Sequence, residues 1–474
     1  MCRHAVSRGV PVWVLAFALA LGACTREPRY VVTEAKQLQA LHKAWSERDK
    51  FPPLDPLDYR APLYAKYLKG LKICLDPGHG GDAAQKGYKR GPTEYREAIV
   101  NWKVANYLKE FLEGSGAQVK LTRAGDVEVG LAERVRIANE WRADLFISLH
   151  HNAIDNPSVN RTTTWFHMDP DFEPANCDLA RYIQQGVADA LQLPQIDGVP
   201  LKSDQLMYKT GFGVLRGLNM VACLCEASFF THPYEEYRMK QESYVKREAY
   251  GYFLGLARYA WMGIPKATLT NPNPGSVIEN KRPKIEMRAN NGLSDRGNWG
   301  GDRPWIFSDS AVVTIDGKKV ASSFDKTSGT ITAVLQEPLA PGDHVVRGGF
   351  RSYAGNYSHP VKFTFTVDPP VEFLNVEFVP RPPEAPADQP TTITLTALDA
   401  DGDPVRDGTE LRLTSDGATF SSDVVKTKGG RAAAVIASVK VPGDKPLAIR
   451  VEGKFGSIPI ILQKPHGAPF LWRE

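Results

Sequence analysis

The chain has 474 residues, of which 42% are hydrophobic and 24% are charged. This composition is typical of a globular protein and excludes a disordered or collagen-like chain. The 58 basic and 54 acidic side chains leave a net charge of only +4, so we expect no nucleic acid partner. At roughly 150 residues per domain, the length allows about three domains.

The first 24 residues have the pattern of a secretory signal. Basic side chains precede an apolar run over residues 10–21, and Gly22-Ala23-Cys24 follows it. The run is too short for a transmembrane helix, which needs about 20 residues. Small residues before a cysteine resemble the lipobox of bacterial lipoproteins, in which the cysteine is acylated. We therefore expect residues 1–23 to be a signal peptide and Cys24 to carry lipid; the alternative is an ordinary signal peptide cleaved near a cysteine.

The segment after the cysteine indicates where the anchored protein resides. By resemblance to lipoprotein sorting, Thr25 in place of aspartate favours the outer over the inner membrane. This predicts a lipid-anchored protein of the bacterial cell envelope, at the outer membrane and facing the periplasm. Residues 24–70 are polar and contain a proline-rich sequence at 51–56, so we interpret them as a stalk between the lipid and the first folded domain.

Residues 71–265 have the pattern of an α/β domain. Apolar runs over residues 71–75 and 144–149 predict buried strands. Apolar residues at helical spacing predict helices over 97–113 and around 178–191. This alternation predicts a mixed sheet flanked by helices.

Beyond residue 270 the pattern changes to that of an all-β protein. The segment 270–275, rich in asparagine and proline, separates the α/β pattern from the all-β pattern. Asp368-Pro369-Pro370 marks a second boundary, within the all-β part. Residues 362–367 alternate polar with apolar side chains, as a strand with one buried face does. Asp316-Gly317 between the segments 312–315 and 318–320 predicts a hairpin, because both residues adopt positive φ at little cost.

We expect two all-β immunoglobulin-like sandwiches in this part of the chain, over residues 275–368 and 371–474. The second resembles the invasin-like modules of bacterial surface proteins on account of its acidic sequence Asp399–Val405. Such modules would act as spacers or would bind the cell wall, an activator or another envelope protein.

Polar side chains follow three of the predicted strands of the α/β domain. His79 lies in the turn Asp76–Asp82 after the first strand, His150 and His151 end the second, and Glu226 follows an apolar third. Carboxyl ends of strands are where open α/β sheets bind ligands. A histidine in a glycine-rich turn is, by itself, more often structural. Successive strand residues face opposite sides, so only one of the two adjacent histidines should point into a site.

Glu97 begins the predicted helix between the first two of these strands. Taken alone, a carboxylate in this position could simply complement the helix dipole. Together with two histidines, however, it completes the ligand set of a catalytic zinc, and a further carboxylate nearby is the usual general base.

Four motifs occur in the order found in zinc-dependent N-acetylmuramoyl-L-alanine amidases, which the first domain resembles. The motifs are Asp76–Gly81, Glu97–Asn101, Ser148–Ala153 and Leu224–Phe229. The resemblance implies that His79, Glu97 and His150 bind Zn²⁺ and that Glu226 is the catalytic residue. It also implies that His151 stands at a variable position.

The activity implied by this resemblance is hydrolysis of the amide between N-acetylmuramic acid and L-alanine in peptidoglycan. One alternative is a non-catalytic envelope protein that binds peptidoglycan or regulates another wall hydrolase, although retention of all four site residues argues against it. Another is a zinc amidase that acts on a different acylated amine or peptide.

The sequence also departs from the family pattern. Ser228 stands where the family usually has glycine, so the loop beside Glu226 should differ in geometry. His167 and His232 match no ligand position, and we leave both out of the site. Some relatives carry a blocking helix in the region corresponding to residues 160–210, and the sequence does not decide whether a helix here covers the site.

Overall fold

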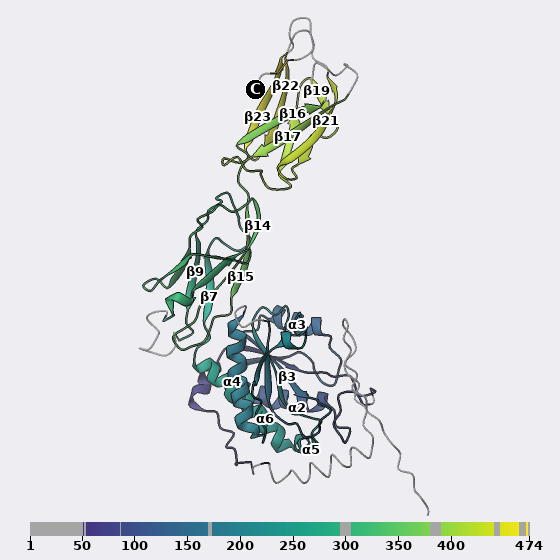
Figure 1. Ribbon diagram of the computed structural model, residues 1–474, viewed down its shortest axis with the longest axis vertical. Helices are drawn as coiled ribbons and strands as arrows, with labels where there is room; N and C mark the ends of the chain where they lie inside the picture. Colours follow the sequence, from purple (N-terminus) through teal and green to yellow (C-terminus); the bar gives the residue numbers. More distant parts are fainter. Residues whose placement is uncertain are drawn as a thin grey trace, which may run out of the picture. The chain divides into compact units, whose positions relative to one another are not determined.

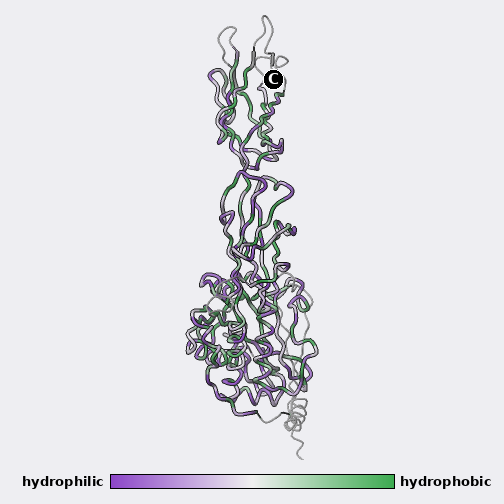
Figure 2. The backbone as a smooth tube through the Cα atoms, turned by 90° about the vertical axis from the view of Figure 1, so that its left-hand side faces the viewer, coloured by the Kyte–Doolittle hydropathy of each residue, from purple (hydrophilic) through white to green (hydrophobic). Residues whose placement is uncertain are grey.

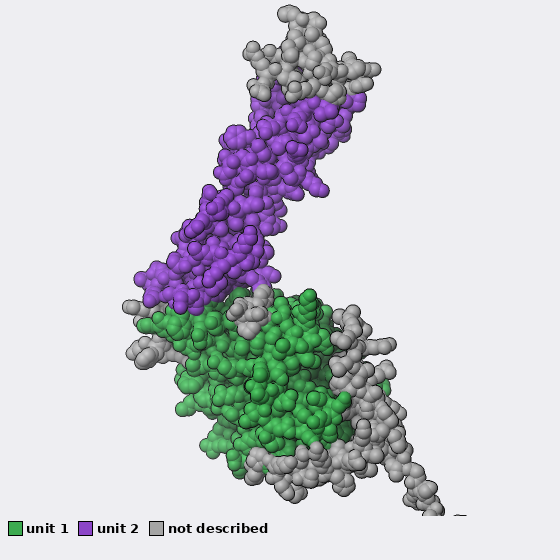
Figure 3. All heavy atoms as spheres, in the orientation of Figure 1, with its two compact units in different colours: residues 1–266, 290–307, 350–360 green, residues 267–289, 308–349, 361–474 purple. Residues whose placement is uncertain are grey.

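The structure is a computed structural model that describes most of the chain. The described residues are 51, 54–85, 87–168, 173–293, 305–379, 390–439, 446–463 and 471–472. Cys24, the predicted signal peptide and much of the predicted stalk lie outside them. The chain divides into two compact units (Figure 3). Unit 1 comprises residues 1–266, 290–307 and 350–360, and unit 2 comprises residues 267–289, 308–349 and 361–474.

A six-stranded mixed sheet forms the centre of unit 1 (Figure 1). In spatial order its strands are β2 (Gln118–Leu121), β1 (Lys72–Pro77), β3 (Leu145–Asn152), β6 (Val221–Phe229), β4 (Thr163–Phe166) and β5 (Leu201–Ser203). The first four run parallel, whereas β4 is antiparallel to β6. The strands predicted over 71–75 and 144–149 correspond to β1 and β3, and the predicted mixed α/β architecture is confirmed.

Helices cover both faces of this sheet, because its central strands are apolar on both faces. The helices are α2 (Glu97–Gly114), α3 (Leu131–Trp141), α4 (Pro174–Leu191), α5 (Pro233–Met239) and α6 (Glu242–Trp261), with short 3-10 helices η2 (Leu63–Leu68) and η3 (Asp204–Leu206). Ile73 and Leu75 of β1 share a core with α2, α4 and α6. Cys74, between them, joins a second core with Ala138 of α3. The helices predicted over 97–113 and around 178–191 correspond to α2 and α4.

The described thiols are free, and those of Cys223 and Cys225 are buried in β6. Burial raises the pKa of the Cys225 thiol to about 12, so this cysteine behaves as a small apolar residue. Within the described ranges, no helix is both long and apolar enough to span a membrane.

The first β-rich part of the chain forms two sheets and one short 3-10 helix, η4 (Ser308–Ser310). One sheet has the order β11 (Lys318–Val320), β10 (Val312–Ile315), β14 (Gly342–Gly349), β15 (Val361–Val367) and β8 (Val277–Ile278). The other has the order β12 (Ser322–Asp325), β13 (Thr330–Ala333), β9 (Ile285–Asn290) and β7 (Lys266–Asn271). The predicted hairpin joins β10 to β11, and Asp316 and Gly317 have φ of 50° and 79°.

The second β-rich part of the chain also forms two sheets. One has the order β16 (Phe373–Val379), β17 (Thr391–Leu398), β21 (Arg431–Val439) and β19 (Ala418–Phe420). The other has the order β20 (Val424–Lys426), β18 (Glu410–Thr414), β22 (Leu447–Gly453), β23 (Gly456–Gln463) and β24 (Leu471–Trp472). Alternate residues such as Ile393, Leu411 and Ile449 bring both sheets into one buried core. Figure 2 shows hydrophobic and hydrophilic residues interspersed along these strands. The immunoglobulin-like relationship stays a prediction.

Candidate active site

The candidate active site lies where β1, β3 and β6 end. His79 follows β1, and Glu97 is the first residue of α2. His150 lies in β3 directly opposite Glu226 of β6 in the strand register. Paired residues on neighbouring strands point to the same face of a sheet. The structure therefore brings His79, Glu97 and His150 together and places Glu226 beside His150.

The carboxylate of Glu97 lies between two histidine rings. Its Oε2 is 3.1 Å from Nε2 of His79, and its Oε1 is 3.1 Å from Nδ1 of His150. Burial by itself raises the pKa of Glu97, but the charge of His79 and the hydrogen bond from His150 hold that pKa well below its usual range. Glu97 is therefore ionised at neutral pH.

These three side chains fit a divalent cation. One ligand atom from each lies within 4.8 Å of the other two. Oε2 of Glu97 is buried, and among the described residues its contact with Nε2 of His79 is not aligned as a hydrogen bond, so this oxygen has no well-placed donor. A buried carboxylate oxygen is costly without a partner, and a metal ion would supply one. Two imidazoles and one carboxylate match the protein ligands of catalytic zinc sites, which keep one position open for water or substrate.

The turn after β1 requires glycine and is held by a buried arginine. A side chain at Gly78 would overlap the imidazole of His150, and His79 has a left-handed backbone with φ of 57°. Arg134 of α3 donates to the backbone carbonyl of His79 at 2.9 Å and to the carboxylate of Asp76 at 2.7 Å. These hydrogen bonds stabilise an otherwise unfavourable backbone conformation and hold His79 at the site.

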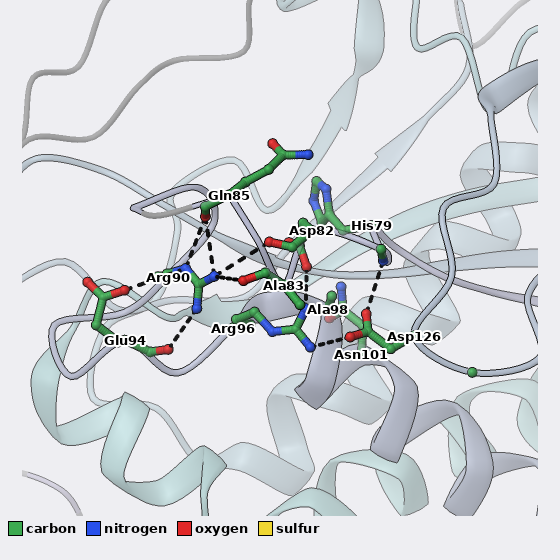
Figure 4. A network of polar contacts seen from close by, with 12 residues as sticks. His79, Asp82, Ala83, Gln85, Arg90, Glu94, Arg96, Ala98, Asn101 and Asp126 are labelled. Carbon is green, nitrogen blue, oxygen red and sulfur yellow. Dashed lines mark hydrogen bonds and ion pairs between the residues drawn. The ribbon is translucent and has the colours of Figure 1, made fainter.

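A second arginine fixes the segment between His79 and α2 (Figure 4). Arg96 donates to Oδ1 of Asp82 at 2.7 Å and also pairs with the carboxylate of Asp126. Asp126 in turn accepts a hydrogen bond from the backbone N–H of Gly81 at 3.0 Å. The sequence alone does not reveal a role for Arg96, because the partners of a single arginine are not visible in a local pattern. The only signal is that Asp82 lies in the glycine-rich turn.

Glu226 differs from Glu97 in its electrostatic surroundings. Loss of hydration raises the pKa of Glu226 to about 7, although the positive charge of His150 acts in the opposite direction. Its Oε2 is buried and accepts no hydrogen bond from any described residue. A carboxyl group that titrates near neutral pH can both accept and release a proton during a reaction.

The strand that carries Glu226 is bulged just beyond it. His150 pairs with Glu226, but Asn152 pairs with Phe229, so β6 contains one residue more than β3 over this stretch. Bulges re-aim side chains and are common next to active sites. This bulge includes Ser228, the position at which the sequence departs from the family pattern.

The other three histidines of this region lie outside the ligand group. His167 pairs with Asp204 at 2.8 Å, and His232 accepts a hydrogen bond from the backbone of Glu235 at the start of α5. His151 is buried and is hydrogen-bonded to other side chains. As expected of adjacent strand residues, only one of the histidines at the end of β3 reaches the ligand group.

Helix α4 belongs to the core of unit 1. Its buried residues Leu179, Ile183 and Val187 join the hydrophobic core, and the helix packs against β6 and α6. The sequence does not decide whether a helix within residues 160–210 covers the site. In the described part of that region, the only α-helix is this core helix.

A second group of possible metal ligands lies in unit 2, in the acidic sequence that suggested an invasin-like module. It consists of Asp399, Asp401 and Asp403. The ammonium group of Lys281 lies 2.6–3.0 Å from a carboxylate oxygen of each aspartate. A lysine therefore already contacts all three carboxylates and offsets part of their negative charge.

Comparison with known proteins gives the family of the first domain. Residues 73–258 match the family described as "N-acetylmuramoyl-L-alanine amidase". The chain is 30% identical over 174 residues to LytH of Staphylococcus epidermidis, a probable cell wall amidase. The aligned segment covers 37% of this chain and 53% of that protein. It is 31% identical over 191 residues to the N-acetylmuramoyl-L-alanine amidase LytC of Bacillus subtilis, with 40% of this chain and 36% of that protein covered.

The chain therefore spans about half or less of the length of these curated relatives. Among solved structures, an N-acetylmuramoyl-L-alanine amidase from Clostridium difficile 630 is 27% identical, with 40% of this chain and 97% of that chain covered and a TM-score of 0.36. The segment that matches the family contains all four sequence motifs and, apart from Lys72 at the start of β1, all six strands of the sheet. Residues 73–258 are therefore a domain of the N-acetylmuramoyl-L-alanine amidase family.

Proposed function

We propose that this protein is a zinc-dependent cell-wall amidase that hydrolyses the amide between N-acetylmuramic acid and L-alanine in peptidoglycan. The observation that carries the proposal is the group of buried Glu97 with the partly exposed His79 and His150, with Glu226 beside it, in a domain of the amidase family. The ligand types match zinc, and a bound cation would account for Oε2 of Glu97, which has no well-aligned hydrogen-bond donor among the described residues.

In this proposal His79, Glu97 and His150 hold the metal, and Glu226 moves the proton. Bound zinc would polarise the scissile carbonyl and lower the pKa of water to about 7. Glu226 would take the proton of the attacking water and later deliver a proton to the leaving amine of L-alanine. Its pKa of about 7 suits both steps, and a cation bound nearby would shift it downward and favour the base form.

Digestion of purified sacculi tests the proposed activity. The full chain should release free stem peptides and leave the glycan strands intact, which mass spectrometry of the products identifies. Shortened glycan or cleaved cross-links would contradict it. Release of nothing from sacculi would favour a non-catalytic wall protein or an amidase for another acylated amine, and the latter should still cleave acyl-amine model substrates.

Zinc binding is expected to weaken as the pH falls from about 8 to about 5. Burial lowers the pKa of His150, but the hydrogen bond and negative charge of Glu97 outweigh burial and raise that pKa above its ordinary value. A histidine nitrogen binds metal only after losing its proton, so protons compete with zinc increasingly as the pH decreases. Zinc titrations of the metal-free full chain at several pH values measure the effect. An affinity that is constant over this range would contradict the assignment of His150 as a ligand.

We also propose that lipid on Cys24 anchors the protein to the outer membrane, with the enzyme facing the periplasm. The support is the signal-like sequence that ends in Gly22-Ala23-Cys24. The parent protein should then sediment with membranes, whereas the variant Cys24→Ala should be found in the soluble fraction. A Cys24→Ala variant that sediments with membranes like the parent would overturn the proposal. The β-rich parts would serve as spacers or as surfaces for the wall or a partner protein.

A further inference from the structure

His151 is a buried side chain that the proposed ligand set does not use. Its side chain and that of Glu248 on α6 are each only 1% exposed. Both ring nitrogens are engaged: Nδ1 lies 2.8 Å from Oδ1 of Asn101, and Nε2 lies 3.0 Å from Oε2 of Glu248. The imidazole therefore bridges α2 and α6 in the core beneath the site.

The direction of these hydrogen bonds follows from the surroundings of Asn101. Its Nδ2 donates to Oε1 of Glu97 at 3.2 Å and to the carbonyl of Gly78 at 3.3 Å, and both of these groups are acceptors. The amide oxygen of Asn101 must then face His151, so Nδ1 of His151 donates to it. On the other side of the ring, Nε2 forms a hydrogen bond with Oε2 of Glu248. A continuous series of hydrogen bonds thus runs from Glu248 to Glu97.

His151 also contacts Glu97 directly. Its backbone N–H donates to Oε1 of Glu97 at 3.1 Å. This carboxylate oxygen therefore receives hydrogen bonds from Asn101 and from the backbone of His151, and the side chain of His151 holds Asn101 in turn. Partners of this kind orient a ligand and limit its rotation, and their loss typically weakens metal binding 10–100-fold.

We propose that His151 and Glu248 are positioning residues that raise the affinity of the site for zinc, by holding Asn101 and thereby the carboxylate of Glu97. The inference rests on the proposed function, because it assumes that Glu97 is a zinc ligand. It gives a function to the one histidine of the Ser148–Ala153 motif that the ligand set leaves out, and it connects α6 to the metal site.

A purely structural role predicts a different result, and the same domain offers a matched control. His167 and Asp204 form a second buried pair of histidine and carboxylate, with Nδ1 and Oδ2 2.8 Å apart. This pair does not contact His79, Glu97 or His150 through any hydrogen bond of the structure. If such pairs only stabilise the fold, breaking either one should lower the unfolding midpoint and leave zinc affinity unchanged.

The experiment measures the dissociation constant for zinc in the full chain by competition with a chromophoric chelator, next to the unfolding midpoint. His151→Phe and Glu248→Leu should each raise the dissociation constant about 10–100-fold. Glu248→Gln should remain within about threefold of the parent, because its amide can still hydrogen-bond Nε2 of His151. His167→Phe should lower the unfolding midpoint without changing zinc affinity. Saturating zinc should restore kcat in the positioning variants, with KM unchanged.

Zinc affinities of both His151→Phe and Glu248→Leu within about twofold of the parent would overturn the proposal. An equal loss of affinity in His167→Phe would also overturn it. If His151→Phe does not fold, the zinc dissociation constants of Glu248→Leu and Glu248→Gln are compared instead. Equal constants for these two variants would overturn the proposal. A parent chain that binds no zinc or releases no stem peptide would instead refute the proposed function, so the two failures are distinguishable.

Discussion

Replacing Glu226 with glutamine should lower kcat on sacculi by about 10²–10⁴-fold while the protein retains its zinc. Glutamine has the shape of glutamate but cannot take a proton from water or return one to the leaving amine. Glu226 lies beside His150 but outside the group of ligand atoms, so zinc binding should persist. Stem-peptide release gives the rate, and metal analysis of the same sample gives the zinc content.

Glu236→Gln is a suitable control for this variant. Glu236 is another buried carboxylate whose pKa burial raises, and it accepts hydrogen bonds from the backbone N–H groups of Thr93 and Tyr95. Its substitution should change kcat far less, because its carboxylate is hydrogen-bonded to the backbone and does not belong to the ligand group. Activity close to that of the parent in Glu226→Gln would refute the assigned proton transfer. Loss of zinc from that variant would show instead that Glu226 is a ligand.

Removal of zinc should abolish stem-peptide release altogether and should do so equally in the parent and in Glu226→Gln. Without the metal, the pKa of water stays far above neutral, and Glu226 by itself cannot make water an effective nucleophile. The measurement is the rate of release after dialysis against a chelator, followed by stepwise return of zinc. Activity should return in proportion to the zinc bound and should reach its maximum at one zinc ion per chain, held by His79, Glu97 and His150.

Activity that persists in a sample shown to contain no metal would contradict a metal-dependent reaction. A matched sample dialysed without chelator controls for handling. If the chelated parent loses activity but other divalent ions restore it better than zinc, the metal-dependent mechanism stands and the choice of zinc is wrong.

Some features of the fold could be predicted from the sequence because they depend on local patterns. The helix predicted over residues 97–113 is α2, because apolar side chains at helical spacing bury one face. The hairpin at Asp316-Gly317 formed as predicted, because both residues adopt the positive φ that the turn requires. A strand followed by a glycine-rich turn similarly indicated where His79 would lie.

Other features depend on contacts between distant parts of the chain. Residues 290–307 and 350–360 belong to unit 1 although they lie within the β-rich sequence. Asn356, for example, donates to the carbonyl of Gly263, 93 residues earlier. The antiparallel pairing of β4 with β6 likewise depends on a contact between distant parts of the chain. Local patterns show that a segment is a strand or a loop, but they do not show which neighbour it will have.

For the candidate site, the sequence by itself determined which residues to consider, because His79, Glu97, His150 and Glu226 all occur in motifs tied to single strands or to one helix start. Only the tertiary structure decided what holds these residues in place. Glu248 reaches His151 across 97 residues of sequence, and Arg134 reaches the carbonyl of His79 across 55. Such contacts arise when amphipathic helices pack onto the sheet and bury polar groups, which must then find partners wherever the fold provides them.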